Sequence, residues 1–203
     1  SAPKYNVANL HAGAVELFVG KRAHLRYSTI ENWSKNMYNL NTKRARCEEE
    51  GEIEWISGSF GSHVGYLYPM SVLSGRKSRS SFTGITFAGA GQNLDTGCKV
   101  VLGAPDTTAT VETKSISKGG GISTFRSSIV ATPTAEGSAA SVSCQSLMLD
   151  DISRSDTIPA MDIRAKNVDI GHEATIGRIG DDKIFYLMSR GISEEEARTM
   201  IVN

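Results

Sequence analysis

Apolar and small residues alternate with polar ones along two segments of the chain. One face of the first segment carries Ala140, Val142, Cys144, Ser146 and Met148, and one face of the second carries Val168, Ile170, His172, Ala174 and Ile176. A period of two puts alternate side chains on the same side of a strand, so each segment predicts a strand with one packed face. Elsewhere between residues 7 and 179, short apolar runs are broken by turn residues every few positions, which predicts an all-β region of many short strands.

The turns of this region do not favour a meander of tight hairpins. Residues 75–78, 119–121 and 135–137 separate strand-like runs, and none of them contains the Asn-Gly or Asp-Gly pair of two-residue hairpin loops. Two all-β architectures stay open: a sandwich, and a parallel β-helix in which rungs of roughly 20 residues stack around a continuous interior. Periodicity alone does not decide between them, because no clean internal repeat is visible.

The chain changes character at Gly180. Asp181 or Asp182 can cap a helix over residues 183–190, and a Ser-x-x-Glu capping box starts a second helix at Ser193. The apolar stripe of the second helix has no evident partner, and the chain begins without Met. We therefore expect the natural protein to continue beyond this sequence.

Composition narrows the functional class. The 203 residues suffice for one domain, and 22 basic against 22 acidic residues give a formal net charge of +0, which argues against a general nucleic-acid binder. The apolar runs are much shorter than the ~20 residues of a membrane-spanning helix. Three cysteines form no even disulfide framework and no signal peptide is evident, so we expect a reducing cytoplasm.

The familiar catalytic fingerprints are missing. The chain has no phosphate-binding P-loop, no nucleophile elbow and no His-Glu-x-x-His, and it has no Cys-x-x-Cys pair from which one chain could close a zinc or four-cysteine site. Any site for a soft metal must therefore be incomplete or shared. His172 and Glu173 offer two possible ligands, although a histidine on an apolar strand face is more often a core residue.

Each cysteine, taken alone, is more often a small buried apolar residue than a reactive group. Cys144 alternates with apolar neighbours, which supports that interpretation. Cys47 shares its strand face with Lys43, and a nearby cation favours the thiolate. Cys98 has the weakest case for a chemical role.

Several short sequence segments occur together, and their order along the chain is distinctive. They are residues 153–159 (Ser-Arg-Ser-Asp-Thr-Ile-Pro), 171–175 (Gly-His-Glu-Ala-Thr), 185–187, 189–192 and 200–202, preceded by 27–29 with 32–33, 42–44 with 47–48, 68–69, and 95–97 with 99. In this order they closely resemble the SufB/SufD family of the Suf iron-sulfur cluster assembly machinery. The resemblance covers nearly the whole chain, and Cys47 and Cys144 favour its SufB branch.

The resemblance implies a fold and a role. The fold is a right-handed parallel β-helix over residues 1–179, followed by the start of a C-terminal helical region over residues 180–203. The role is that of a scaffold rather than an enzyme: a nascent iron-sulfur cluster is built on it from iron and sulfide and then transferred to apo-proteins. Flavin binding is left open.

The resemblance also assigns roles to individual residues. These are the cluster ligands Cys144, His172 and Glu173, the sulfur acceptor Cys47, and the supporting cations Lys43 and Lys99. Many bacterial relatives carry Glu before the histidine, where this chain has Gly171. One chain supplies too few ligands for a cluster, so we expect two chains to meet at the site.

The implied partners are a SufC-like ATPase, a SufD-like paralogue or a second copy of this chain, and a cysteine desulfurase as sulfur donor, with no nucleic acid and no membrane. Three alternatives remain: a SufD-like paralogue, a β-helical polysaccharide lyase or hydrolase, and a purely structural platform. A lyase or hydrolase needs clustered carboxylates, and Asp150 with Asp151 is a tight acidic pair of the strand region.

Overall fold

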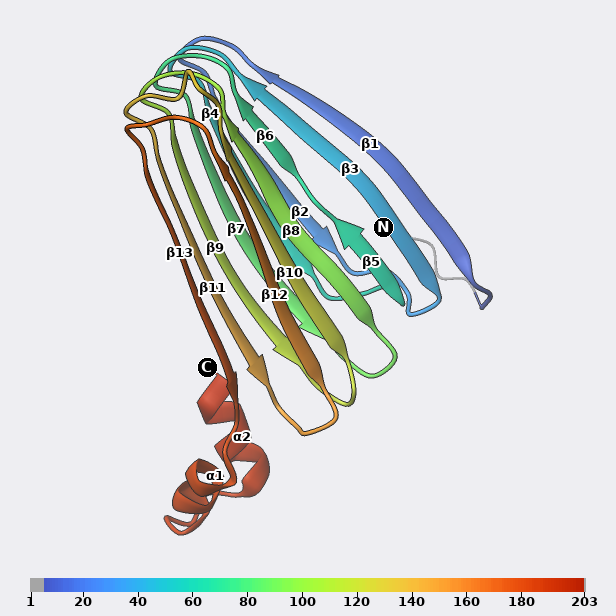
Figure 1. The fold of residues 1–203 in the computed structure, drawn as a ribbon. Helices are drawn as coiled ribbons and strands as arrows, with labels where there is room; N and C mark the ends of the chain where they lie inside the picture. The colour runs from blue at the N-terminus through green and yellow to red at the C-terminus, as the bar shows by residue number, and fades with distance from the viewer. Residues whose placement is uncertain (1–5, 203) are drawn as a thin grey trace.

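The computed structural model describes residues 6–202 and shows a solenoid of parallel strands followed by two short helices. Figure 1 shows the strands lying side by side with the helices at one end. One sheet, here the first sheet, contains β1 (Asn9–Val19), β3 (Met37–Cys47), β5 (Val64–Leu67), β6 (Met70–Leu73), β8 (Asn93–Leu102), β10 (Ile122–Ala131) and β12 (Arg154–Ile163). The second sheet contains β2 (His24–Glu31), β4 (Glu52–Ser59), β7 (Arg79–Ala88), β9 (Thr108–Ser117), β11 (Ala139–Met148) and β13 (Asp169–Arg178).

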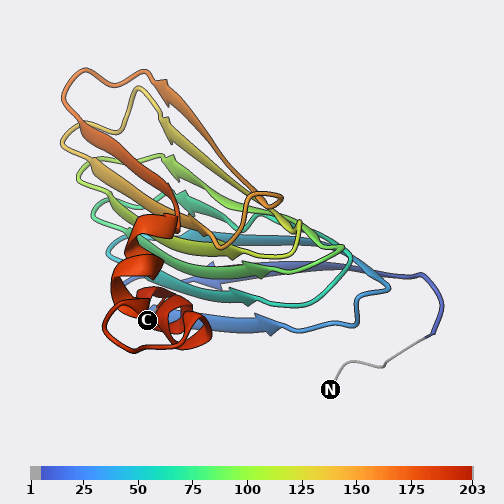
Figure 2. The ribbon, with the colours of Figure 1, turned by 90° about the horizontal axis from the view of Figure 1, so that it is seen from below.

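Apart from β5 and β6, which follow each other within the first sheet, the chain alternates between the two sheets, and consecutive strands do not pair with each other. Each inner strand pairs in parallel with the strand one coil earlier and the strand one coil later, as β11 does with β9 and β13. The predicted parallel β-helix is thereby confirmed and the sandwich of hairpins is wrong. In Figure 2 the coils follow one another in colour order, with the helices nearest the viewer.

The coils are longer than the rungs of roughly 20 residues expected from the sequence. Tyr38 pairs with Val64, which is 26 residues later, and Ile122 pairs with Arg154, which is 32 residues later. Most strands run for about ten residues, and every coil needs two of them plus two turns. The longer coil follows from this strand length.

One set of turns repeats from coil to coil with the same backbone conformation. Its residues at positive φ are Arg22, Glu50, Lys77, Asp106 and Gly137. In each turn the backbone N–H of this residue donates to a carbonyl of the next coil, for example Asp106 to Glu136 and Gly137 to Asn167. These hydrogen bonds pair backbone N–H and C=O groups that would otherwise have no partner in the turn. They also fix the stacking of successive coils.

Side chains that face inward form one continuous core between the two sheets. The largest fully buried apolar side chains are Ile53, Leu73, Leu94, Leu102, Ile129, Val100 and Val111. All three cysteines are free and buried in the same interior. The interior also contains many buried hydroxyl groups, such as the hydrogen-bonded pair Ser71 and Ser80.

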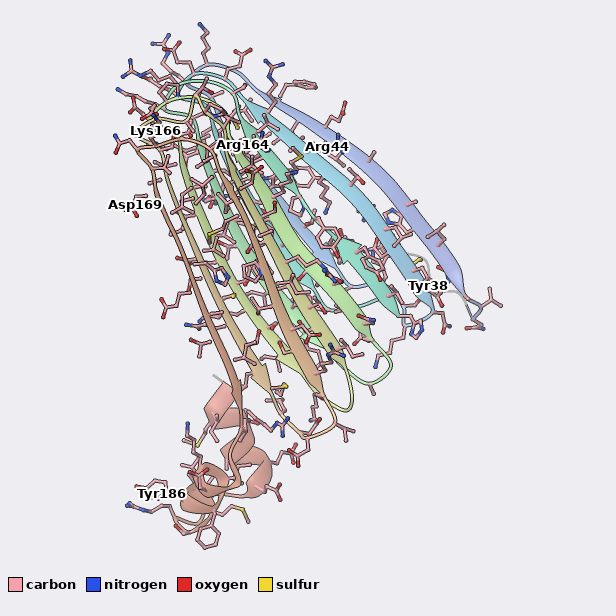
Figure 3. All side chains as sticks on the ribbon, in the orientation of Figure 1. Tyr38, Arg44, Arg164, Lys166, Asp169 and Tyr186 are labelled. Atoms are coloured by element: carbon pink, nitrogen blue, oxygen red, sulfur yellow. The ribbon has the colours of Figure 1, made fainter. Side chains whose placement is uncertain are left out.

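The change from strands to helices falls between Arg178 and Asp181. Helix α1 spans Asp181–Met188 and α2 spans Glu194–Val202, and both pack around Ile184 and Ala197 with Leu147 of β11. Figure 3 shows the labelled Tyr186 on this helical end, far from the opposite end of the strands, where Arg164, Lys166 and Asp169 are labelled. Neither described helix has the length and apolar character needed to span a membrane.

The two predicted helix starts differ in outcome. The capping box is confirmed, because Ser193 N–H donates to the Glu196 carboxylate and Glu196 N–H donates to Ser193 Oγ. The predicted cap by Asp181 or Asp182 is wrong, because the N-cap is Gly180 and it makes no side-chain cap bond. The side chain of Asp181 lies outside the described part of the chain.

Candidate functional site

The last two coils place a thiol and an imidazole side by side. Cys144 on β11 and His172 on β13 both belong to the inward-facing rows of their strands. The Cys144 Sγ lies 3.7 Å from the His172 Nε2, although the two residues are 28 positions apart in sequence. Ala174 is the direct register partner of Cys144, and its short side chain leaves the longer His172 side chain as the polar neighbour of the thiol. Figure 1 shows the two strands adjacent at the end of the solenoid.

The thiol of Cys144 has two further polar neighbours. Its Sγ lies 3.9 Å from Thr157 Oγ1 on β12 and 3.6 Å from the backbone oxygen of Glu173. Burial raises the pKa of Cys144 because it disfavours the thiolate, and the hydrogen bond with Thr157 opposes that rise. At neutral pH the group is therefore a thiol until a cation replaces its proton.

Glu173 contributes differently from what the sequence predicts. Neighbouring residues of a strand point to opposite faces, and the side chain of Glu173 is exposed while that of His172 is half-buried. The backbone carbonyl of Glu173 contacts the thiol, whereas its carboxylate belongs to the outward row. Within this chain Glu173 does not share the inward face with Cys144.

This end of the solenoid is open. Strands β12 and β13 are the last in their sheets, and no strand within residues 6–202 pairs with their outer edges. Inward-facing apolar side chains of this coil are accordingly exposed: Met161 by 42%, Ile163 by 47% and Ile176 by 46%. Free strand edges next to exposed core residues are typical of a surface that receives another protein.

The donor set of one chain is small. Residues 6–202 contain no group of three or more His, Cys, Asp or Glu side chains that could hold a metal ion. Cys144 and His172 supply one sulfur and one nitrogen donor, which are both ligand types found in iron-sulfur centres. The pair therefore forms half of a four-ligand site at most.

Cys47 and Cys98 lie deeper than Cys144. Cys47 ends β3 with none of its surface exposed, and burial together with the charge of Glu52 raises its pKa to about 12. Burial likewise raises the pKa of Cys98 to about 12. The structure does not bring either thiol to the Cys144–His172 pair by any contact among the described residues.

Lys43 is a buried cation, but it does not act on Cys47 as the sequence predicts. Its Nζ lies 3.0 Å from Glu31 Oε1 and 3.2 Å from Thr29 Oγ1. The other carboxylate oxygen of Glu31 accepts hydrogen bonds from Trp33 Nε1 at 2.8 Å and Asn39 Nδ2 at 3.3 Å. Burial alone raises the pKa of Glu31, but these hydrogen bonds and the Lys43 charge outweigh it and lower the pKa.

Lys99 lies outside the solenoid. It belongs to the exposed outward row of β8, and its charge helps to lower the pKa of Asp162, for which the hydrogen bond from Arg164 is the main cause. The structure thus gives the two supporting lysines different surroundings. Lys43 lies in the interior and Lys99 on the outer face.

A row of small and hydroxyl-bearing residues connects the two ends of the interior. In register along the second sheet it contains Thr29, Ser57, Gly84, Thr113 and Cys144. Two voids of about 10 Å³ each lie along it, and each has room for one water molecule. Lys43 lines the first void, Thr113 lines the second, and Ser57 lines both.

Sequence reasoning missed two polar residues of these clusters. Thr157 lies within the segment 153–159 that carries the resemblance, but its contact with Cys144 crosses from one sheet to the other and leaves no local signal. Glu31 continues the inward row of β2 through Tyr27 and Thr29, so strict alternation could have flagged a charge on an interior face.

Comparison with known proteins agrees with the family resemblance found in the sequence. The family model described as "SUF system FeS cluster assembly, SufBD core domain" matches residues 2–203. The iron-sulfur cluster assembly protein SufB of Bacillus subtilis is 45% identical over 202 residues, covering 100% of this chain and 43% of that protein. An iron-sulfur cluster assembly SufBD family protein of Staphylococcus saprophyticus is 45% identical with the same coverage. One of Mycobacterium tuberculosis is 44% identical, and the match covers 24% of its length. The chain thus spans less than half the length of these curated relatives.

Proposed function

Because this chain belongs to the SufBD core family of the SUF system of iron-sulfur cluster assembly, we propose that it serves as a SufB-type scaffold. In this role it receives iron and sulfide as cargo, holds the nascent cluster and releases it to apo-proteins. It performs no catalysis of its own. Iron and sulfide are the material that is assembled, so they are substrates of the process rather than resident groups.

The observation that carries the proposal is the Cys144–His172 pair at the open end of the solenoid. Its two donors lie beside free strand edges and exposed core residues, so a second chain that docks there can complete the ligand set. Glu173 joins the set through its outward carboxylate once a partner approaches that edge. A second copy or a SufD-like paralogue fits this requirement.

The chemistry of the pair suits temporary binding. Four thiolates hold a cluster tightly, whereas a mixed set of sulfur, nitrogen and oxygen donors binds it less tightly and allows release. The pKa of Cys144 is raised, so iron binding must displace the thiol proton and the affinity rises with pH. His172 lies near enough to accept that proton or to bind the metal.

Sulfur delivery forms the second part of the proposal. Cys47 accepts sulfane sulfur from a cysteine desulfurase. Lys43 is a supporting cation in the interior and Lys99 one on the outer face of β8, and neither acts directly on the Cys47 thiol. The row from Thr29 to Cys144 supports passage through the interior, because its side chains are small or carry hydroxyl groups. The buried state of Cys47 means that its thiolate must be generated when the donor binds.

The remaining partners follow from the same role. A SufC-type ATPase acts on the helical region that begins with α1 and α2, where Phe185, Tyr186 and Met200 are exposed apolar side chains. Three free thiols are kept reduced in the cytoplasm, which is the compartment we propose. The regions of residues 1–179 and 180–203 then form the β-helix core and the start of the ATPase-binding part.

Anaerobic reconstitution tests the proposal. The purified chain, alone and with its paralogue, is incubated with ferrous iron and sulfide, and visible charge-transfer absorption, iron and acid-labile sulfide are measured. A scaffold acquires the absorption bands and stoichiometric iron and sulfide. A platform without ligands acquires neither, and that result would refute the scaffold role.

Two alternative functions are supported to different degrees. A SufD-like role is the second candidate, and it predicts that the chain forms a cluster only when a separate SufB-type subunit supplies the thiolate. The polysaccharide lyase or hydrolase is not supported, because the family match points elsewhere. Its acidic pair is also engaged in loop contacts: Asp150 accepts from Gly119 and Ser153, and Asp151 pairs with Arg178.

A further inference from the structure

The outer face of the first sheet carries a contiguous block of apolar and aromatic side chains, here called the outer patch. It consists of two neighbouring rows of register partners on β1, β3 and β5: Leu10, Tyr38 and Val64, then Ala12, Leu40 and Tyr66. Register partners on adjacent strands lie about 4.8 Å apart, so these side chains are neighbours. Leu10 is 63% exposed, Tyr38 41%, Leu40 40% and Tyr66 42%. A continuous exposed block of this kind is typical of an interaction surface, unlike single scattered apolar residues.

No helix among residues 6–202 covers the outer patch. Helices α1 and α2 pack against Leu147 of the second sheet, and Figure 1 shows them at the end of the solenoid away from β1. The faces of parallel sheets are usually covered by helices. A helix that lies along the strands is therefore the element best suited to cover this face.

Cations lie on the same face, further along the strands. Arg44 of β3 and Lys99 of β8 both pair in register with Met70 of β6 or adjoin it in the same row. This row lies four residues beyond that of Leu40, which is about 13 Å along the strands. Figure 3 shows Tyr38 of the outer patch and Arg44 at different points along β3.

Positive charge is in excess on this face. Its three aspartates each form an ion pair with an arginine: Asp95 with Arg126, Asp156 with Arg154 and Asp162 with Arg164. Among the described strands this leaves the cations Arg44, Arg46 and Lys99 outside ion pairs, against the one carboxylate of Glu16. The excess favours a ligand that bears carboxylates.

One further cation is held in place for a ligand. The Nε and Nη2 of Arg126 donate to the Asp95 carboxylate at 2.9 to 3.0 Å, and Tyr68 also hydrogen-bonds to that carboxylate. The Asp95 side chain is 9% exposed, whereas that of Arg126 is 48% exposed, and its Nη1 has no hydrogen-bond partner among the described residues. A guanidinium fixed in this way loses little conformational freedom when it binds a second carboxylate.

We propose that the outer patch and the cations beside it form a docking surface for an amphipathic, acidic helix of a partner protein. Two to three turns of a helix cover roughly 11–16 Å, which brackets the offset between the patch and the cations. The fitting helix therefore bears large apolar residues in one part and Asp or Glu two to three turns away on the same face. The chain's own α2 matches this spacing poorly, because its exposed Met200 follows Glu196 by only about one turn. A partner protein is thus favoured over a second copy.

A synthetic peptide tests the docking surface. The probe is a fluorescently labelled peptide of about 18 residues, long enough to form a helix, with leucines in its first two turns and glutamates on the same face two to three turns later. The control peptide has the same composition, with the glutamates on the opposite face. Fluorescence anisotropy should show that the purified chain binds the probe about tenfold more tightly than the control, and less tightly at high salt.

Substitutions at exposed positions locate the contact without disturbing the core. Leu40→Glu should abolish binding of the probe, whereas Ile85→Glu, at an outward position of the second sheet that is 51% exposed, should leave binding unchanged. Arg44→Glu should weaken binding of the probe to about the level of the control peptide. A probe with lysines in place of the glutamates should bind Arg44→Glu better than the wild type. Circular dichroism checks that each variant keeps the fold.

Equal affinities for the two peptides, or unchanged binding to Leu40→Glu, would overturn the proposal. A dimer in sedimentation that Leu40→Glu abolishes would assign the patch to a second copy, and tighter binding of single-stranded oligouridylate than of the probe would assign it to nucleic acid. Probe binding that is lost when this chain is extended in its native reading frame would assign the patch to another segment of the same chain. None of these assays requires a cluster, so a chain that binds the probe and forms no cluster refutes the proposed function alone.

Discussion

The Cys144 thiol and the His172 imidazole lie 3.7 Å apart because one coil of the solenoid separates them. Neither residue is close to the other in sequence, and neither strand alone makes a site. The parallel register of β11 and β13 creates the pair, and the end of the solenoid places it beside the free strand edges. The contact between these two residues is therefore the most direct target for mutation.

Substitution of Cys144 by serine should abolish cluster formation and leave the fold intact. Serine keeps the shape of the side chain but lacks the soft sulfur donor that iron prefers. Cys98→Ser is the matched control, since Cys98 is equally buried and has no polar partner in the candidate site. Iron and acid-labile sulfide are measured after anaerobic reconstitution with the partner subunit. Equal cluster content in Cys144→Ser and the wild type would exclude Cys144 as a ligand.

The strand that carries Cys144 shows how much the sequence predicts. Alternation along residues 140–148 correctly predicts which side chains of β11 face inward. It cannot predict that His172 is the neighbour of Cys144, because the register between coils depends on turn lengths that range widely. That neighbourhood was expected only through the family resemblance. Alternation along β2 could have flagged Glu31 itself, but not its pairing with Lys43, which lies on a strand of the other sheet.

A glycine in β8 should be essential for packing. A Cβ added at Gly97 would overlap the backbone oxygen of Arg126 on the neighbouring strand, so Gly97→Ala must shift the two strands apart. We expect a loss of about 1–3 kcal/mol, visible as a lower unfolding temperature. Gly171→Ala in β13 is the control, because nothing lies within 4 Å of its added Cβ. Equal unfolding temperatures for the two variants would contradict the packing described for β8 and β10.

Alkaline pH should destabilise the fold through its buried thiols. Burial raises the pKa of Cys98 from 9.0 to about 12, so the unfolded chain releases this proton at a lower pH than the folded chain. The stabilisation is complete below pH 9 and is lost as the pH rises toward 12, by roughly 1.4 kcal/mol per pH unit for each such thiol. Cys98→Ala should therefore show a shallower decline between pH 8.5 and 10.5 in denaturant unfolding. Parallel declines in the variant and the wild type would show that Cys98 titrates normally.

Cys47 should acquire sulfane sulfur from a cysteine desulfurase supplied with cysteine. In this step the Cys47 thiolate attacks the outer sulfur of the donor persulfide, and the donor leaves as a thiolate without net oxidation. The raised pKa of Cys47 makes thiolate scarce, so the rate should increase with pH above neutrality. Mass spectrometry locates the added sulfur, and Cys47→Ser serves as the negative control. Sulfur found only on Cys98, or on no cysteine, would remove Cys47 from the delivery route.

The helical end should be insufficient for strong binding of the ATPase. Helices α1 and α2 have eight and nine residues, a length that is marginal without tertiary packing, and they expose Phe185 by 73% and Met200 by 58%. A docking partner needs these side chains on a rigid surface, which a longer helical region provides. Calorimetric titration of a SufC-type ATPase with this chain, and in parallel with the longer Bacillus subtilis SufB, compares the two. We expect tight binding only to the longer protein, because additional helices would hold α1 and α2 in place. Equal affinities would instead locate the complete docking surface within these 203 residues, and Met200→Glu would then be the substitution to abolish it.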